Sequence, residues 1–307
     1  MKRSSPIYKF RRKCQLFASK IASPEMLSRI YTKAVLKKDV DLKNPQTFNE
    51  KIQWMKIHAY PRMPLVVKCA DKYAVRFYLK EKCLENSCVP ILGAWNNAKD
   101  IKWEKLPQKF VLKCNHGCAY NILVPDKNQL DKKRVVKQLN KWIKEDFGAF
   151  NIERHYSQIK PRMIICEEFL GDCISDYKFF CFNGEPKFIY VSSNLIHDRE
   201  AQIGFFYLNG QKMPLVRKDY SDIPSVTLPD FFNEMLEEAK ILCKDFPFVR
   251  VDFFIANGRY YFAELTFTPS GGMMPFDPEH FDLDWGKMLD IDSLLIDEKY
   301  SKPFKKK

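Results

Sequence analysis

The feature that most constrains the fold is a pair of apolar runs joined by Asn257-Gly258. This dipeptide tolerates positive φ at both positions and is the strongest short-range signal for a β-hairpin with a type I′ turn. We predict a hairpin over residues 250–266, whose second strand ends beside the start of its first. Four polar residues therefore meet at one end of an otherwise apolar frame: Arg250, Asp252, Glu264 and Thr266.

The two carboxylates of this hairpin suggest a metal site. Paired carboxylates in an apolar frame repel each other unless a cation lies between them. Mg²⁺ is typically held by one or two carboxylates together with substrate phosphates, so Asp252 and Glu264 are candidate ligands. The alternative is a pair of solvated charges on the outer face of a sheet, and the hairpin alone does not separate the two interpretations.

A second feature is a short apolar strand that ends in Lys113 and continues into a loop of small residues before the next apolar run. This order allows backbone N–H groups to cover a phosphate while a lysine supplies a point charge. The loop holds one glycine, Gly117, and the chain has no Walker motif. A histidine in such a loop, here His116, is more often hydrogen-bonded in place than a catalyst or a ligand.

A third feature is an apolar strand predicted over residues 163–168, which runs into the segment 167–170. The end of such a strand offers backbone groups to a flat heterocycle. Asp176 and Lys178 follow, two positions apart and therefore on one face of the next strand. Taken alone, this segment favours an ordinary solvent-facing acid–base pair.

In this order, the three features resemble the ATP-grasp superfamily, and in particular its TupA-like branch of teichuronopeptide biosynthesis. The resemblance extends from about residue 44 to Gly272. Its most distinctive pieces are Lys-Cys-Asn-His-Gly117, Asp-Tyr-Lys-Phe-Phe180 with Asn-Gly-Glu-Pro-Lys187, and Glu-Leu-Thr-Phe-Thr-Pro269. It implies an α+β ATP-grasp fold in which two lobes with largely antiparallel sheets clasp ATP, preceded by a helical N-terminal region.

The resemblance also implies roles for individual residues. The phosphates of ATP would meet Lys113, Lys178 and the loop residues Asn115, His116, Gly117 and Asn121. The adenine would be held by Glu167, Glu168, Phe169 and Leu170, and the ribose by Asp176. Mg²⁺ would be held by Asp252, Glu264 and, more weakly, Thr266, where many relatives carry asparagine. The catalytic cations would be Lys178 and two arginines beside the acid substrate, Arg250 and Arg199.

Hydrophobic periodicity and turn signals predict the remaining elements. Helices are expected near 7–20, 25–38, 48–58, 71–83, 131–145, 229–244 and 284–296, and strands near 110 and 122. Two more Asn-Gly pairs predict hairpins over 177–191 and 203–214. The expected domains are a basic helical N-terminal region (1–60), an N-terminal lobe with the phosphate loop and adenine hinge (61–170), and a C-terminal ATP-grasp lobe with the metal site (171–307).

The charge of the chain is unevenly distributed. The net charge is +13, and residues 2–20 hold seven basic residues and no acid. Apolar residues in this segment recur every three or four positions: Ile7, Phe10, Cys14, Phe17, Ala18 and Ile21. This pattern predicts a basic amphipathic helix that either packs on the protein or lies on an anionic membrane surface. A nucleic-acid partner is not expected, because no recognised binding motif occurs.

Nothing in the sequence suggests a membrane span or a signal peptide, since no apolar run approaches roughly 18 residues, so we expect a cytoplasmic protein.

The resemblance implies an ATP-dependent carboxylate–amine ligase of bacterial cell-surface polysaccharide synthesis, which joins an amino acid to a sugar acid. Two alternatives stay open. One is a glycosyltransferase, with Asp282-Leu-Asp284 as its metal motif. The other is a non-catalytic nucleotide-binding protein at the membrane's inner face. Donor, acceptor and oligomeric state are not specified by the sequence.

Overall fold

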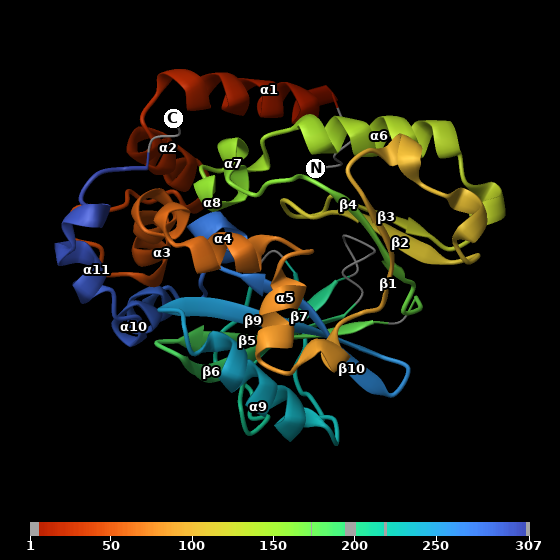
Figure 1. Ribbon diagram of the computed structural model, residues 1–307. Helices are drawn as coiled ribbons and strands as arrows, with labels where there is room; N and C mark the ends of the chain where they lie inside the picture. Colours follow the sequence, from red (N-terminus) through yellow and green to blue (C-terminus); the bar gives the residue numbers. More distant parts are fainter. Residues whose placement is uncertain (1–5, 173, 194–200, 218–219, 305–307) are drawn as a thin grey trace.

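Two β-sheets form the framework of the computed structural model, which describes residues 6–172, 174–193, 201–217 and 220–304 (Figure 1). The smaller sheet has the strand order β1-β4-β2-β3, and the larger sheet has the order β10-β9-β5-β6-β7-β8. Among the described strands, all pairs are antiparallel except the short pair β7–β8. The predicted α+β fold with largely antiparallel sheets is confirmed.

The smaller sheet comprises β1 (Ile91–Trp95), β2 (Phe110–Cys114), β3 (Asn121–Val124) and β4 (Ile164–Glu168). Alternate residues of β2 point to opposite faces, so Leu112 is fully buried whereas Lys113 faces the other way. Helix α6 (Lys132–Lys144) covers the buried face with Val135 and Leu139. Strand β1 was missed in the sequence, because Ile-Leu-Gly-Ala-Trp is short and lacks alternation.

The larger sheet comprises β5 (Ser175–Phe182), β6 (Glu185–Ser193), β7 (Gln202–Tyr207), β8 (Ser221–Asp222), β9 (Phe248–Ala256) and β10 (Arg259–Thr266). Two predicted Asn-Gly hairpins are confirmed. Both residues have positive φ in each turn, 51° and 80° at Asn183-Gly184, and 53° and 73° at Asn257-Gly258. The third predicted hairpin, over 203–214, does turn at Asn209-Gly210, but an isolated bridge between Phe206 and Lys212 replaces its second strand.

The helices beside α6 are α1 (Pro6–Ile21), α2 (Pro24–Leu36), α3 (Phe48–His58), α4 (Pro64–Ala70), α5 (Val75–Glu81), α7 (Phe147–Phe150), α8 (Arg154–Ser157), α9 (Phe232–Cys243), α10 (His280–Met288) and α11 (Asp292–Ile296). Most predicted helices are confirmed to within a few residues. None of the helices in the described part of the chain has the length and hydropathy of a membrane span.

Two predicted helices differ from the structure. The helix expected over 71–83 begins only at Val75, because the Asp71 carboxylate accepts the backbone N–H groups of Tyr73 and Ala74 and stabilises a turn there. The prediction of a single helix over 284–296 is wrong. The chain forms α10 and α11 with a break between them, and Lys51 Nζ donates to the Leu289 carbonyl at 2.6 Å where α10 ends.

One face of the larger sheet serves both the core and the site. Even-numbered residues of β5 and β9 share this face. Towards one end, Phe180, Phe182 and Phe248 pack around Phe48 of α3 and Trp285 of α10. Further along the same strands, the face carries four charged residues: Asp176, Lys178, Arg250 and Asp252. The opposite face packs against α9. The two sheets lie on either side of residue 170 in the sequence, and the predicted domain boundaries stay predictions.

Candidate active site

A β-bulge in the β9–β10 hairpin brings its two carboxylates to one face of the sheet. The strands pair in strict register for four residues from the turn, and the register then shifts so that Glu264 lies opposite Asp252. In an unshifted register, Ala263 would oppose Asp252 and Glu264 would point to the other face. The bulge is therefore the local feature that creates a two-carboxylate site.

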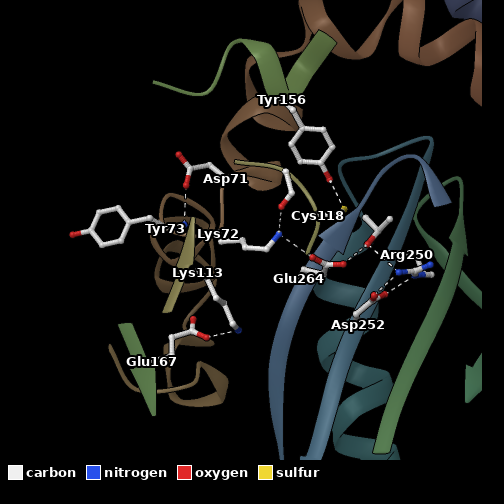
Figure 2. Close-up of polar contacts among 12 residues, drawn as sticks. Asp71, Lys72, Tyr73, Lys113, Cys118, Tyr156, Glu167, Arg250, Asp252 and Glu264 are labelled. Carbon is white, nitrogen blue, oxygen red and sulfur yellow. Dashed lines mark hydrogen bonds and ion pairs between the residues drawn. The ribbon is translucent and has the colours of Figure 1, made fainter. Parts of the chain in front are cut away.

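Each oxygen of this carboxylate pair has a polar partner. Arg250 Nε and Nη2 donate to Asp252 Oδ1 and Oδ2 at 2.7 and 2.6 Å, and Nη2 also donates to Thr266 Oγ1 at 3.1 Å. Thr266 Oγ1 in turn donates to Glu264 Oε1 at 3.1 Å. Lys72 Nζ donates to Glu264 Oε2 at 3.1 Å (Figure 2). The residues predicted to hold the metal are thus together, and two cations neutralise them.

Burial and neighbouring charge act in opposite directions on these carboxyl groups. Burial alone would raise the pKa of Glu264, but Lys72 and Arg250 outweigh it and lower that pKa to about 2. Burial is the larger effect at Asp252, which is 2% exposed, and its pKa lies above the usual value despite the proximity of Arg250 and Lys178. The neighbouring cations therefore favour the ionised form of Glu264, whereas burial disfavours that of Asp252.

The smaller sheet contributes Lys113 to the same region. Lys113 Nζ donates to Glu167 Oε2 at 2.5 Å, and Arg76 Nη2 donates to Glu167 Oε1 at 2.8 Å. Lys113 Nζ also lies 5.8 Å from the centre of the Phe254 ring, which is on the same face of the larger sheet as Lys178. The two predicted phosphate-binding lysines thus face one region from different sheets.

Lys178 lies between two acids of the larger sheet. Its Nζ is 2.7 Å from Asp176 Oδ1 and 3.9 Å from Asp252 Oδ2, and all three side chains are less than 10% exposed. Asp176 Oδ2 also accepts the hydroxyl of Ser192 at 3.4 Å. The predicted ribose-binding acid therefore holds the predicted phosphate lysine in place.

Two predicted phosphate-loop residues, Asn115 and His116, have fully buried side chains. Asn115 Nδ2 donates to Asp71 Oδ2 at 2.9 Å, and its Oδ1 accepts the Met163 N–H at 2.8 Å. His116 Nε2 bonds the Trp142 carbonyl at 3.1 Å, and burial lowers the pKa of His116 to about 4. These side chains anchor the loop from inside and leave its backbone as the part that can meet a ligand.

The tip of the loop is shaped around Gly117. Its φ is 89°, and a Cβ at this position would lie 2.4 Å from the Phe147 ring, so only glycine fits without rearrangement. The Gly117 carbonyl accepts Lys72 Nζ at 3.1 Å, which links the loop to the carboxylate that Lys72 also holds. Asn121, the last predicted loop residue, is exposed at the start of β3.

The segment predicted to hold adenine lies at the end of β4. This strand pairs with β1 and β2 on its two sides, so the Glu167 backbone belongs to the sheet, and the Glu168 N–H donates to the Pro90 carbonyl at 3.1 Å. Leu170 is buried in a small apolar cluster. The side chains of Glu168 and Phe169 line a cavity of about 490 Å³ together with Leu92, Lys105, Leu106, Pro107 and Lys109.

Sequence reasoning missed two cations of this site, Lys72 and Arg76. Periodicity suggested one long helix from residue 71, whereas Lys72 belongs to the turn that Asp71 stabilises. An Asp-Lys pair just before a helix was the signal that could have found it, because an aspartate that caps a turn also fixes its neighbour. Arg199, the second predicted substrate cation, lies outside the described residues.

The residues present fit Mg²⁺ that is bound together with substrate phosphates. Asp252 and Glu264 offer hard oxygen ligands from facing strands, and the Thr266 hydroxyl lies beside them. In the described part of the chain, no group of three or more His, Cys, Asp or Glu side chains is arranged to hold a metal ion. Two protein carboxylates would therefore need phosphate oxygens to complete the coordination.

Comparison with known proteins identifies the family to which the chain belongs. The sequence profile of the TupA-like ATPgrasp family matches residues 50–290, well over half of the chain. The chain belongs to this family. Membership supports an ATP-dependent ligase as the general class of activity, and the matched region includes both carboxylates together with Lys72, Lys113 and Lys178. Among curated proteins, none matches the sequence.

Several solved structures of ligases are similar to part of this chain. The D-alanine–D-alanine ligase from Helicobacter pylori is 14% identical, with 79% of this chain and 69% of that chain covered and a TM-score of 0.46. The L-amino acid ligase from Bacillus licheniformis is 13% identical over 80% of this chain and 57% of that one, with a TM-score of 0.44. The D-alanine–D-alanine ligase from Bacillus anthracis is 16% identical over 67% of this chain, which spans 59% of that ligase, with a TM-score of 0.41. At these values the likeness concerns the fold alone.

Proposed function

We propose that the protein is an ATP-dependent ligase that joins a carboxylate to an amine through an acylphosphate. In the first step a carboxylate oxygen of the acid takes the γ-phosphoryl group of ATP, and ADP leaves. In the second step the amine attacks the acyl carbon, phosphate leaves and the nitrogen loses a proton. The main structural support is that Lys72 and Lys178, from separate elements, lie at the carboxylates Glu264 and Asp252, while Lys113 of the smaller sheet faces Phe254 on the same face of the larger sheet.

Phosphoryl transfer between two anions requires fixed positive charge, which the chain supplies. Lys113 and Lys178 would bind phosphate oxygens, and their carboxylate partners, Glu167 and Asp176, hold the two ammonium groups in position beforehand. The loop at Gly117 would cover the phosphates with backbone N–H groups. The segment 167–170 and Asp176 stay the proposed sites for the adenine and the ribose.

Asp252 and Glu264, with Thr266 beside them, would hold Mg²⁺. A bound Mg²⁺ would supply positive charge against the negative charge that develops on the phosphates during transfer. Arg250 orients Asp252 and Thr266 through three hydrogen bonds and stays the proposed cation beside the acid substrate. Because of those bonds, replacing Arg250 would disturb the metal ligands as well as substrate binding.

The substrates proposed on the basis of the family are a sugar acid and an amino acid, joined during bacterial cell-surface polysaccharide synthesis. ATP is a cytoplasmic substrate, so we place the reaction in the cytoplasm, with peripheral contact at the inner face of the membrane. No observation favours a glycosyltransferase. Asp282 and Asp284 lie two positions apart on α10 and so face different sides, and Asp282 accepts two hydrogen bonds from Asn49, at 2.9 and 3.0 Å.

The test is ADP formation and acylphosphate trapping with a panel of uronic acids and amino acids. The wild type should release ADP with one acid, and hydroxylamine should trap the hydroxamate of that acid. Asp252→Asn should abolish both products, whereas Asp284→Asn, at a half-buried acid outside the site, should keep them. Sugar transfer from a nucleotide sugar without ADP would identify a glycosyltransferase. Nucleotide binding with no product from any acid would identify a non-catalytic binding protein.

A further inference from the structure

The amphipathic helix α1 turns its apolar stripe outward. Ile7, Phe10, Phe17 and Ile21 are 65–71% exposed, and Cys14, between them in the same stripe, is also exposed. These positions follow each other at spacings of three and four, so they occupy one side of the helix. A helix that used this side to pack on its own protein would bury it. The stripe is therefore available to something other than this chain's described core.

The opposite side of α1 fixes the helix to the protein. Leu16, on this side, is partly buried against the core. The Arg12 guanidinium lies 3.2 Å from the centre of the Phe150 ring, and Arg154 Nη2 donates to the Ser19 carbonyl at 3.3 Å. The outward direction of the stripe is thus set by contacts on the inner side.

Helix α2, which contacts α1, also exposes large apolar side chains. Met26 and Ile30, one turn apart, are each 55% exposed. Large apolar side chains that gather on adjoining elements commonly mark an interaction site, whereas single ones are ordinary surface features. Together α1 and the first half of α2 form what we call the N-terminal apolar surface: Ile7, Phe10, Phe17, Ile21, Met26 and Ile30.

Positive charge borders this surface. Helix α1 contains no acidic residue, and its Arg11, Lys13 and Lys20 are exposed. Helix α6 runs along the same side of the molecule (Figure 1), and both helices line a hollow of about 890 Å³. Helix α6 likewise contains no acid and exposes six basic residues: Lys132, Lys133, Arg134, Lys137, Lys141 and Lys144.

These properties identify the partner by its chemistry. A second copy of the chain would bring the same positive charges against this surface, and like charges repel. An anionic bilayer offers both an apolar interior for aromatic side chains and negative headgroups for lysine and arginine. We propose that α1, the start of α2 and α6 form a docking surface for an anionic phospholipid membrane. Phe10 and Phe17 enter the boundary between headgroups and acyl chains, and the basic residues bind lipid phosphates.

The docking surface leaves the candidate active site accessible. The hollow between α1 and α6 is lined by Ile122 of β3, which pairs with Leu112 of β2. Leu112 and Lys113 point to opposite faces of the smaller sheet, so the membrane would contact the side away from Lys113. The inference concerns this surface and not the reaction. Its failure would leave the ligase proposal untouched.

The test is sedimentation of the full-length protein with vesicles of phosphatidylcholine, with and without phosphatidylglycerol. The wild type should bind only the anionic vesicles, and added salt should weaken binding. The double variant Phe10→Ser/Phe17→Ser should lower the partition coefficient about tenfold or more. Ile296→Ser, which removes an 85% exposed isoleucine elsewhere, should not change it. Lys133→Glu/Lys137→Glu should weaken binding, whereas the exposed pair Lys80→Glu/Lys244→Glu should do so much less.

Circular dichroism and the melting temperature of each variant show that it folds, which these exposed positions should allow. Equal binding to neutral and anionic vesicles would overturn the proposal, as would unchanged binding of Phe10→Ser/Phe17→Ser. A wild-type dimer that this double variant dissociates, with no vesicle binding, would show that a second copy covers the surface instead.

Discussion

At the scale of single residues, Lys72 links the predicted phosphate loop to Glu264, a proposed metal ligand, through the Gly117 carbonyl and the Glu264 carboxylate. Lys72→Met should lower ADP formation by about 100-fold, because Glu264 loses its principal counter-charge and the loop loses a contact. The pKa of Glu264 should also rise from about 2 towards its usual value, since Lys72 is the strongest of the neighbours that lower it.

The pH dependence of kcat/KM checks this role. The acidic limb of the profile should move to higher pH in Lys72→Met, and Lys72→Arg should restore part of the activity, because it keeps the charge. Lys80→Met, at an exposed lysine of the neighbouring helix, is the matched control. An unchanged acidic limb together with wild-type turnover would mean that Lys72 has no part in the site.

A buried histidine, His155, should make the folded state less stable at acidic pH. His155 is fully buried, neither ring nitrogen has a hydrogen-bond partner, and burial lowers the pKa of His155 to about 3. Below pH 6.5 the unfolded chain therefore binds a proton at this residue that the folded chain does not, so stability falls as pH falls. His155→Phe, surrounded by the rings of Tyr60, Tyr156 and Phe267, should remove this contribution.

Denaturant unfolding at pH 6.5 and pH 5 measures the effect. The wild type should lose about 1–2 kcal/mol more unfolding free energy than His155→Phe between these two values, at about 1.4 kcal/mol per proton and pH unit. Equal losses in the two proteins would show that His155 is protonated, or solvated, in the folded state.

At the scale of elements, the predicted phosphate loop requires glycine at position 117 for two reasons: the positive φ and the lack of space for a Cβ. A comparison with Gly258 distinguishes these two effects. Both residues have positive φ, 89° and 73°, but a Cβ at Gly258 would meet nothing within 4 Å. Gly258→Ala should cost about 1 kcal/mol of stability and leave nucleotide affinity unchanged. Gly117→Ala adds a clash with Phe147, so it should cost more and weaken binding of an ATP analogue. Melting temperatures and calorimetric titration compare the two, and equal effects on affinity would contradict the loop's assignment.

Local chemistry explains which elements the sequence predicted. The turns at Asn183-Gly184 and Asn257-Gly258 depend on two residues each, and α3 begins at a capping box between Thr47 and Glu50, so all three were readable. The break between α10 and α11 involves Lys51, which is distant in sequence. A break of that kind cannot be read from a helical period.

In the candidate site, too, local features were predictable from the sequence and contacts between distant segments were not. The residue types and their order gave the carboxylates, the loop and two lysines. The sequence could not show that a bulge, rather than a regular ladder, places Glu264 opposite Asp252. It also could not show that Asn115 and His116 point inward, since burial depends on Asp71 and Trp142 from other segments. Contacts between segments decided each of these points.

At the scale of the whole molecule, we propose that the two sheets together form one nucleotide site. The smaller sheet supplies Lys113 and the loop, and the larger sheet supplies Lys178 and the carboxylate pair. Arg250 and Lys72 already neutralise the two carboxylates, so a divalent cation alone would find no uncompensated negative charge there. The site should therefore bind metal only together with the phosphates of a nucleotide.

Anomalous diffraction from crystals soaked with Mn²⁺, with and without a non-hydrolysable ATP analogue, tests this claim most directly. We expect a manganese peak between Asp252 and Glu264 only when the analogue is present, with its phosphates contacting Lys113 and Lys178. A nucleotide bound away from these residues, for instance in the hollow between α1 and α6, would contradict it. So would a manganese peak of equal height without nucleotide.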